Sequence, residues 1–89
     1  MLLARVVGHV VSTAKHQGLG GATLLIVRPV DPRGVPSGPS MTAVDAVGAG
    51  TGEQVLVVIE GRSAGQATGR PRAPIDAAVV GIVDRLDLP

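Results

Sequence analysis

The chain has 89 residues, with eight basic residues against seven acidic ones, and it contains no Cys, Phe, Tyr or Trp. The absence of cysteine excludes disulfides and thiolate metal sites, and the balanced charge provides no field to attract nucleic acid or an anionic membrane. A single domain over residues 1–89 must build its core from aliphatic side chains, and chains this small usually need further stabilisation. With disulfides and thiolate metal sites excluded, oligomerisation is the source of further stability that remains. No apolar run approaches the ~20 residues that span a bilayer, so a soluble, cytoplasmic protein is expected.

Apolar, β-branched segments alternate with turn signals along the chain, which is typical of a small all-β fold. Gly8 interrupts the first strand pattern and indicates a bulge or a sharp bend. Pro29 and the run from Asp31 to Gly34 carry turn chemistry, and an irregular loop is expected after them. One or two helical turns at most are expected over residues 63–68. Strands are expected over residues 2–12, 22–28, 41–47, 54–60 and 75–86.

The last of these segments fits two patterns. Val79, Ile82 and Leu86 lie on a helical stripe, but the same residues also fit a strand interrupted by Gly81. Glycine costs a helix about 1 kcal/mol relative to alanine, and the residues around Gly81 are β-branched, so a strand is favoured. Five strands with one short helical turn predict a small, partly open, five-stranded OB-like β-barrel.

The glycine-rich run Gly48-x-Gly50-x-Gly52 superficially resembles a phosphate-binding loop. Such a loop needs a strand before it and a helix after it, so that the phosphate lies at the helix N-terminus. Here a strand is expected after the loop, and no Lys-Ser/Thr pair follows it. The run is therefore predicted to connect two strands or to allow close backbone approach to a neighbouring subunit.

No residue constellation predicts catalysis or metal binding. His9 and His16 are too few for zinc, which needs three or four ligands, so solvated or hydrogen-bonded histidines are expected. Nothing in the sequence brings two carboxylates together beside a nucleophile. Asp45 is instead expected to accept backbone hydrogen bonds at the glycine loop, and Asp76 to fix the loop before the last strand. No enzyme, cofactor or metal is predicted.

The only basic concentration consists of Arg62, Arg70 and Arg72. A barrel of the OB type leaves open the alternative of a small module that binds single-stranded nucleic acid. Such sites depend on aromatic platforms, where stacking contributes ~1–3 kcal/mol per base, and this chain has none. Protein–protein contact, in which arginine is enriched, is the more economical interpretation.

Four blocks of sequence, residues 4–15, 24–29, 44–57 and 74–84, occur in an order and at a spacing that resemble a known family. The most specific is Val-Asp-Ala-Val-Gly-Ala-Gly-Thr-Gly-Glu-Gln-Val-Leu-Val at 44–57. Over nearly the full chain the sequence is similar to bacterial microcompartment vertex proteins of the EutN/CcmL type. It departs from them at Arg28, where members usually carry Gln, and at residues 61–65, where Gly-Arg-Ser-Ala-Gly replaces Gly-Ser-Ser-Ala-Arg.

The resemblance implies a structural shell protein in the bacterial cytoplasm. It implies a homopentamer that caps the vertices of a polyhedral microcompartment, with hexameric and trimeric shell proteins as partners. An intersubunit contact is expected at Gly48, Ala49, Gly50, Gly52 and Glu53. A pore or ring-axis segment is expected at Gly61, Arg62, Ser63 and Ala64. Contact with hexameric shell tiles is expected at Arg70, Pro71, Arg72, Ala73 and Pro74.

Overall fold

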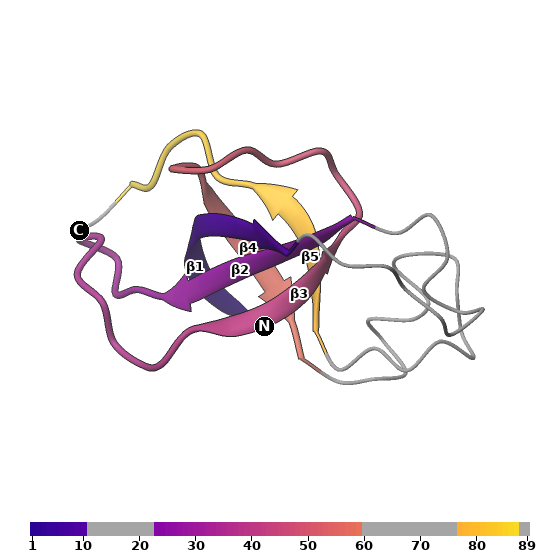
Figure 1. Ribbon diagram of the computed structural model, residues 1–89. Coiled ribbons are helices and arrows are strands. Elements are labelled where there is room, and N and C mark those ends of the chain that lie inside the picture. The colour runs from indigo at the N-terminus through magenta and orange to yellow at the C-terminus, as the bar shows by residue number, and fades with distance from the viewer. Residues whose placement is uncertain (11–22, 60–76, 88–89) are drawn as a thin grey trace.

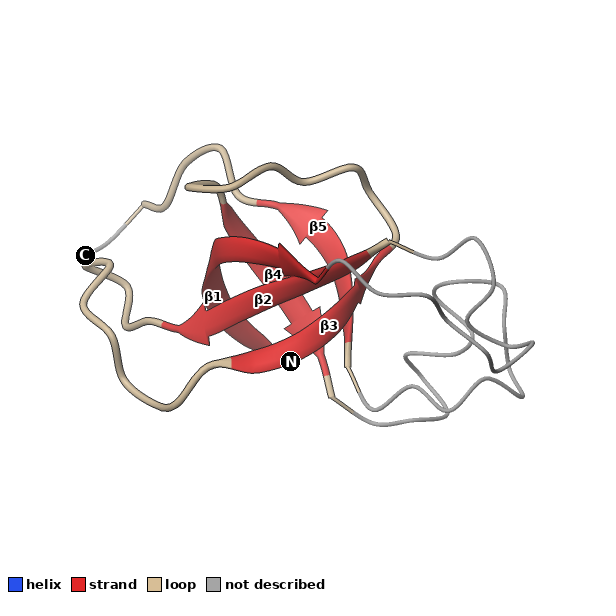
Figure 2. Cartoon of the chain, in the orientation of Figure 1, coloured by secondary structure: helices blue, strands red, loops and turns tan. Residues whose placement is uncertain are grey.

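The computed structural model describes residues 1–10, 23–59 and 77–87. All the regular structure in these residues is β-strand (Figure 2), and none of them forms a helix able to span a bilayer. The strands are β1 (Leu2–Val10), β2 (Leu24–Pro29), β3 (Met41–Asp45), β4 (Gln54–Val58) and β5 (Ala78–Ile82). The helical turn expected over residues 63–68 lies outside the described residues.

The five strands close into a barrel in the order β1-β2-β3-β5-β4 (Figure 1). Neighbouring strands are antiparallel except β3 and β5, which run parallel and pair Val44 with Ala78 and Asp45 with Val79. Because β4 also pairs with β1, every strand has two neighbours and no edge is left unpaired. The five-stranded all-β barrel predicted from the sequence is confirmed. The expectation that it is partly open is wrong, because the pairing of β3 with β5 closes it.

A β-bulge bends β1 where glycine interrupts the strand. Val6 pairs with Val27 and Gly8 with Ile26, so Val7 is an extra residue without a partner on β2. Such bulges increase the local twist and turn the strand, which lets the first half of β1 pair with β4 while the second half stays with β2. The bend predicted at Gly8 is confirmed.

The last segment, whose sequence fits both a helix and a strand, contains strand β5. β5 pairs antiparallel with β4, and a register shift leaves Val80 as an extra residue between the partners of Leu56 and Val57. Gly81 lies opposite Leu56, whose Cδ1 is 3.7 Å from the position that a Cβ on this glycine would take. The strand is confirmed, although it is shorter than expected.

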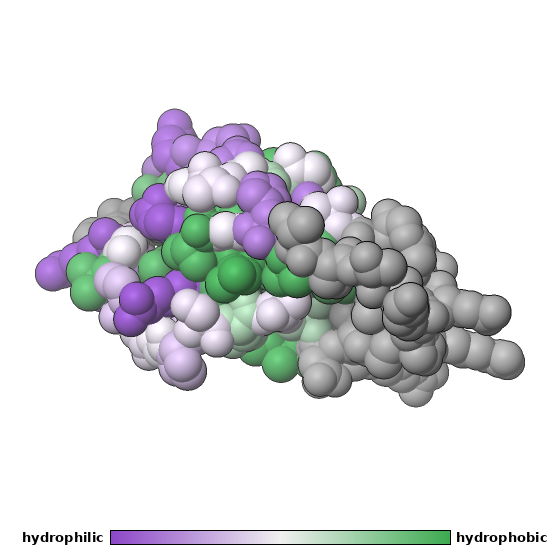
Figure 3. Space-filling model, viewed as in Figure 1, coloured by the Kyte–Doolittle hydropathy of each residue, from purple (hydrophilic) through white to green (hydrophobic). Residues whose placement is uncertain are grey.

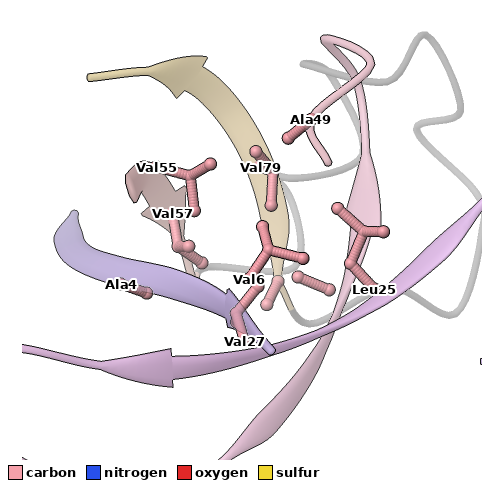
Figure 4. Close-up of a cluster of buried hydrophobic side chains, with 10 residues drawn as sticks. Ala4, Val6, Leu25, Val27, Ala49, Val55, Val57 and Val79 are labelled. Carbon is pink, nitrogen blue, oxygen red and sulfur yellow. The ribbon is translucent and has the colours of Figure 1, made fainter. Parts of the chain in front are cut away.

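The interior of the barrel is small and wholly aliphatic. Figure 4 shows buried side chains from several strands pointing toward one another. Leu2 and Met41 pack against this cluster from its margin. Ten residues form it: Ala4, Val6, Leu25, Val27, Ala43, Ala49, Val55, Val57, Ala77 and Val79. Only one of the ten is larger than valine, so the core gains modest burial from each side chain.

The turn between β2 and β3 has the chemistry that the sequence predicts. The Asp31 carboxylate accepts hydrogen bonds from the backbone N–H groups of Arg33 and Val35, at 2.8 and 3.0 Å. Gly34 has a φ of 85°, which side chains rarely allow. A Cβ there would also lie 3.1 Å from Nη2 of Arg5. The turn is therefore fixed by one carboxylate and one glycine.

Candidate assembly site

The glycine-rich loop between β3 and β4 begins with a carboxylate that holds three consecutive amides. Oδ1 of Asp45 accepts hydrogen bonds from the backbone N–H groups of Val47 at 3.0 Å, Gly48 at 2.9 Å and Ala49 at 3.3 Å. Asp45 occupies the last position of β3, where it pairs with Val79 of β5. The predicted role of Asp45 as an acceptor at the loop is confirmed.

The second half of the loop is attached to β1. The N–H of Gly52 donates to the carbonyl of Val6 at 2.8 Å, and the N–H of Val6 donates to the carbonyl of Glu53 at 2.9 Å. The guanidinium of Arg5 donates to the carbonyl of Gly52 at 2.9 Å. These bonds carry the pairing of β1 beyond the start of β4, so the loop lies along β1 as part of the barrel wall.

Two further contacts fix the middle of the loop. Oε1 of Glu53 accepts a hydrogen bond from the N–H of Gly50 at 2.6 Å. Ala49 is 5% exposed and belongs to the core cluster, so its side chain anchors the loop from inside. Gly48, Gly52 and Glu53 are exposed. The loop therefore presents a fixed backbone surface to the exterior.

Backbone conformation requires glycine at two of the three glycine positions of the run. Gly48 and Gly52 have φ values of 80° and 94°, in the left-handed region that glycine adopts at little cost. Gly50 is not among the described glycines with positive φ, and a Cβ on it would lie 3.4 Å from Oε1 of Glu53. The loop leads into a strand, as predicted, which leaves the phosphate-binding interpretation without its helix N-terminus.

The histidine beside this loop is hydrogen-bonded. Nε2 of His9 lies 3.2 Å from Oγ1 of Thr51, which confirms that histidine's predicted role; His16 lies outside the described residues. Within residues 1–10, 23–59 and 77–87, no group of three or more potential metal-ligating side chains converges. The ion pair found there joins Arg85 to Asp87 at 3.0 Å on an exposed tail, where such pairs contribute little to stability.

The described residues include one of the three surfaces expected from the sequence. The glycine loop is present and its residues lie together. Residues 61–64, expected at the ring axis, and residues 70–74, expected to meet shell tiles, lie outside the described residues, as does Asp76.

Sequence reasoning missed a second surface, formed by aliphatic side chains on the outside of the barrel. Leu56 and Val58 alternate with the fully buried Val55 and Val57 on β4, and the outer pair is only half-buried. The signal was present in the sequence, because β4 is apolar on both faces. In an open sheet, that pattern predicts a central strand that is covered on both faces. In this closed barrel only the inner face of β4 meets the core, so the apolar residues on its outer face need another explanation.

A small closed barrel with a fixed surface loop and aliphatic side chains on its outside is consistent with a structural subunit that assembles with other chains. Comparison with known proteins agrees. Residues 1–84 match the family described as ethanolamine utilisation protein EutN/carboxysome. The chain is 47% identical over 87 residues to the microcompartment shell vertex protein GrpN of Rhodospirillum rubrum (strain F11), covering 98% of this chain and 97% of that protein.

Other relatives extend the agreement. The chain is 48% identical over 86 residues to the shell vertex protein EutN of Escherichia coli (strain K12), covering 97% of this chain and 90% of that protein. A solved structure of an ethanolamine utilization protein EutN superimposes with a TM-score of 0.91 at 46% identity, covering 99% and 91% of the two chains. The GrpN structure from Rhodospirillum rubrum, described as a pentameric microcompartment shell protein, gives 0.84 at 42% identity and covers 99% of each chain.

The chain belongs to the EutN/CcmL family of microcompartment shell vertex proteins. It is a structural component of a bacterial microcompartment shell and not an enzyme.

Replacing Asp45 by alanine should destabilise the fold, because three amides lose their common acceptor. A fall of about 1–2 kcal/mol in the free energy of unfolding is expected, since bonds to a charged acceptor contribute more than neutral ones but these are partly exposed. Asp45→Asn keeps an oxygen at the Oδ1 position and should lose less. Urea unfolding at a single protein concentration measures both variants. Equal midpoints for Asp45→Ala and wild type would contradict the role assigned to this carboxylate.

Proposed function

We propose that five copies of this chain form a closed ring that caps the vertices of a polyhedral bacterial microcompartment. The observation that carries the proposal is the similarity, over 99% of both chains, to a GrpN structure described as pentameric. The whole chain, residues 1–89, acts as one domain in this ring. Its partners are other copies of itself and the hexameric and trimeric proteins of the shell facets.

The geometry of a closed shell supports this role. A flat hexagonal layer cannot close into a polyhedron without fivefold defects, so each vertex needs a component of different symmetry from the facets. A small barrel that assembles into a ring supplies such a component. The ring also supports the barrel, because contact between copies adds the burial that a short chain with a small aliphatic core lacks.

The glycine loop is proposed to lie at or beside the contact between copies. Its exposed backbone is fixed by Asp45, Arg5 and Glu53 before any partner arrives, so little conformational freedom is lost on assembly. Glycine allows a neighbouring backbone to approach closely. The proposed contact residues are Gly48, Ala49, Gly50, Gly52 and Glu53, with Ala49 holding the loop from inside.

Two further segments have proposed roles that follow from the resemblance. Residues 61–64, Gly-Arg-Ser-Ala, are proposed to lie near the ring axis, where Arg62 would give this chain a different local charge from its relatives. Residues 70–74, Arg-Pro-Arg-Ala-Pro, are proposed to contact neighbouring facet proteins. Arginine is enriched in protein interfaces, and the two prolines restrict the backbone that presents it.

The alternative of a nucleic-acid module gains no support. The chain offers no aromatic side chain on which a base could stack.

The ring and its glycine contact are tested together by native mass. The wild-type chain should have about five times the 8.9 kDa mass of one copy in light scattering after size exclusion. Gly50→Leu should give a smaller species, because a bulky side chain would separate the two backbones. The variant chain should remain folded, since among the described residues the one atom within 4 Å of a Cβ at this position is the end of the Glu53 side chain, at 3.4 Å.

Gly38→Leu is the matched control. This glycine is half-buried in the loop after β2, and a Cβ there would meet only the ring of Pro29, at 3.6 Å. The control should keep the wild-type mass. A ring that survives Gly50→Leu unchanged would contradict the proposed contact, and a monomeric wild-type chain at micromolar concentration would contradict the ring.

The contact with facet proteins is tested by reversing charge. The double variant Arg70→Glu and Arg72→Glu should still form rings but should fail to close shells when it is produced together with hexameric shell proteins. Electron microscopy of the assembled particles distinguishes closed polyhedra from open sheets and tubes. Shells that close normally with the double variant would contradict this proposed contact.

A further inference from the structure

One aliphatic surface lies on the outside of β1 and β4. Side chains alternate between the two faces of a strand, and Val55 and Val57 point into the core with no exposure. Leu56 and Val58 therefore point outward, where both are half-buried. Leu3 of β1 pairs directly with Leu56 and extends the apolar surface across the strand boundary. Leu3, Leu56 and Val58 are called the β4 face below.

A second aliphatic surface lies on the outside of β1 and β2. Leu25 and Val27 are fully buried, so Leu24 and Ile26 point outward, and both are half-buried. The bulge residue Val7 is 46% exposed and lies next in the chain to Gly8, the partner of Ile26. Val7, Leu24 and Ile26 are called the β2 face. The space-filling view, in which β2 and β3 lie toward the viewer, shows apolar surface at the middle of this side (Figure 3).

Each face contains a long aliphatic side chain next to a glycine. Cδ1 of Leu56 lies 3.7 Å from the position of a Cβ on Gly81, and Cδ1 of Ile26 lies 3.9 Å from that of a Cβ on Gly8. The side chains therefore lean over positions that carry no side chain of their own. No side chain of Gly81 or Gly8 stands beside them, which suits close packing against another surface.

A polar row separates the two faces. Arg5 of β1 pairs with Arg28 of β2 on one side and with Gln54 of β4 on the other. All three are outward positions, and the row runs across three neighbouring strands. This row separates the β4 face from the β2 face along β1.

Two distinct surfaces are what a ring of identical copies requires. In a closed ring each copy contacts its neighbours head to tail, so one patch must meet a different patch on the next copy. We propose that the β4 face of one copy packs against the β2 face of the next. This assignment rests on the proposed ring and specifies which surfaces close it.

The glycine loop is continuous with the β2 face. The loop bonds to Val6 through the amide of Gly52 and contacts His9 through Thr51, so it flanks Val7 on both sides along β1. A neighbouring copy seated on the β2 face would therefore also meet the loop. The aliphatic side chains supply the buried area of this interface, and the loop supplies a fixed margin.

Cysteine cross-linking tests the pairing of the faces, because the wild-type chain contains no cysteine. The variant carrying both Leu56→Cys and Ile26→Cys, treated with a short bis-maleimide, should give a denaturing-gel ladder that extends to five chains. Cysteine behaves as a small hydrophobic residue, so these outward positions should tolerate it.

Each single variant should remain uncross-linked, because identical faces do not meet. Val35→Cys with Leu86→Cys, at exposed aliphatic positions outside both faces, is the matched control and should give no ladder.

A charge on one face provides an independent measurement. Leu56→Lys should reduce the native mass to that of one chain, whereas Val35→Lys, at a position 55% exposed and outside both faces, should leave the ring intact. Circular dichroism confirms that the strands are retained. Cross-linking within either single cysteine variant would overturn the head-to-tail pairing. An intact ring in which the double cysteine variant forms no ladder would overturn the assignment of faces alone, while a monomeric wild type would overturn the ring as well.

Discussion

The rest of this structure depends on closing five strands around an interior that is filled by aliphatic side chains, with no aromatic side chain in the sequence. The short parallel pairing of β3 with β5 completes the closure, supported by hydrogen bonds from the N–H of Val44 to the carbonyl of Ala77 at 3.0 Å and from Ala46 to Val79 at 3.1 Å. Asp45 lies between these bonds, so the strand pairing that closes the barrel also positions the carboxylate that organises the glycine loop. Closure and loop geometry are one structural unit.

The same closure explains why some aliphatic side chains lie on the outside of the barrel. A barrel of this size has room inside for little more than valine and alanine, and among the described residues ten small or medium side chains form its core. The larger aliphatic residues Leu56 and Ile26 lie outside, half-buried, on either side of a polar row. In the proposed ring these side chains contact the neighbouring copies, and membership of a shell vertex family gives that contact a role. The fold and the proposed assembly therefore use opposite faces of the same strands.

Much of this architecture could be predicted from local sequence. Strand order along the chain, the bend at Gly8 and the bonds accepted by Asp45 follow from patterns of a few neighbouring residues. The parallel pairing of Val44 with Ala78 could not be predicted, because it joins segments more than thirty positions apart. Nor does the spacing of three glycines reveal that Gly48 and Gly52 need positive φ while Gly50 does not. The two outer faces were not predicted, because an apolar run looks the same whether its second face is buried in a core or lies on the outside of a barrel.

The central claim is that association with other copies supplies stability that the small barrel lacks alone. The most direct test is the thermal unfolding midpoint of the wild-type chain as a function of protein concentration. Coupled assembly predicts that the midpoint rises steadily across about a hundredfold range, because mass action favours the folded, associated state. A midpoint that stays constant over that range would show that each barrel unfolds independently and would contradict the account.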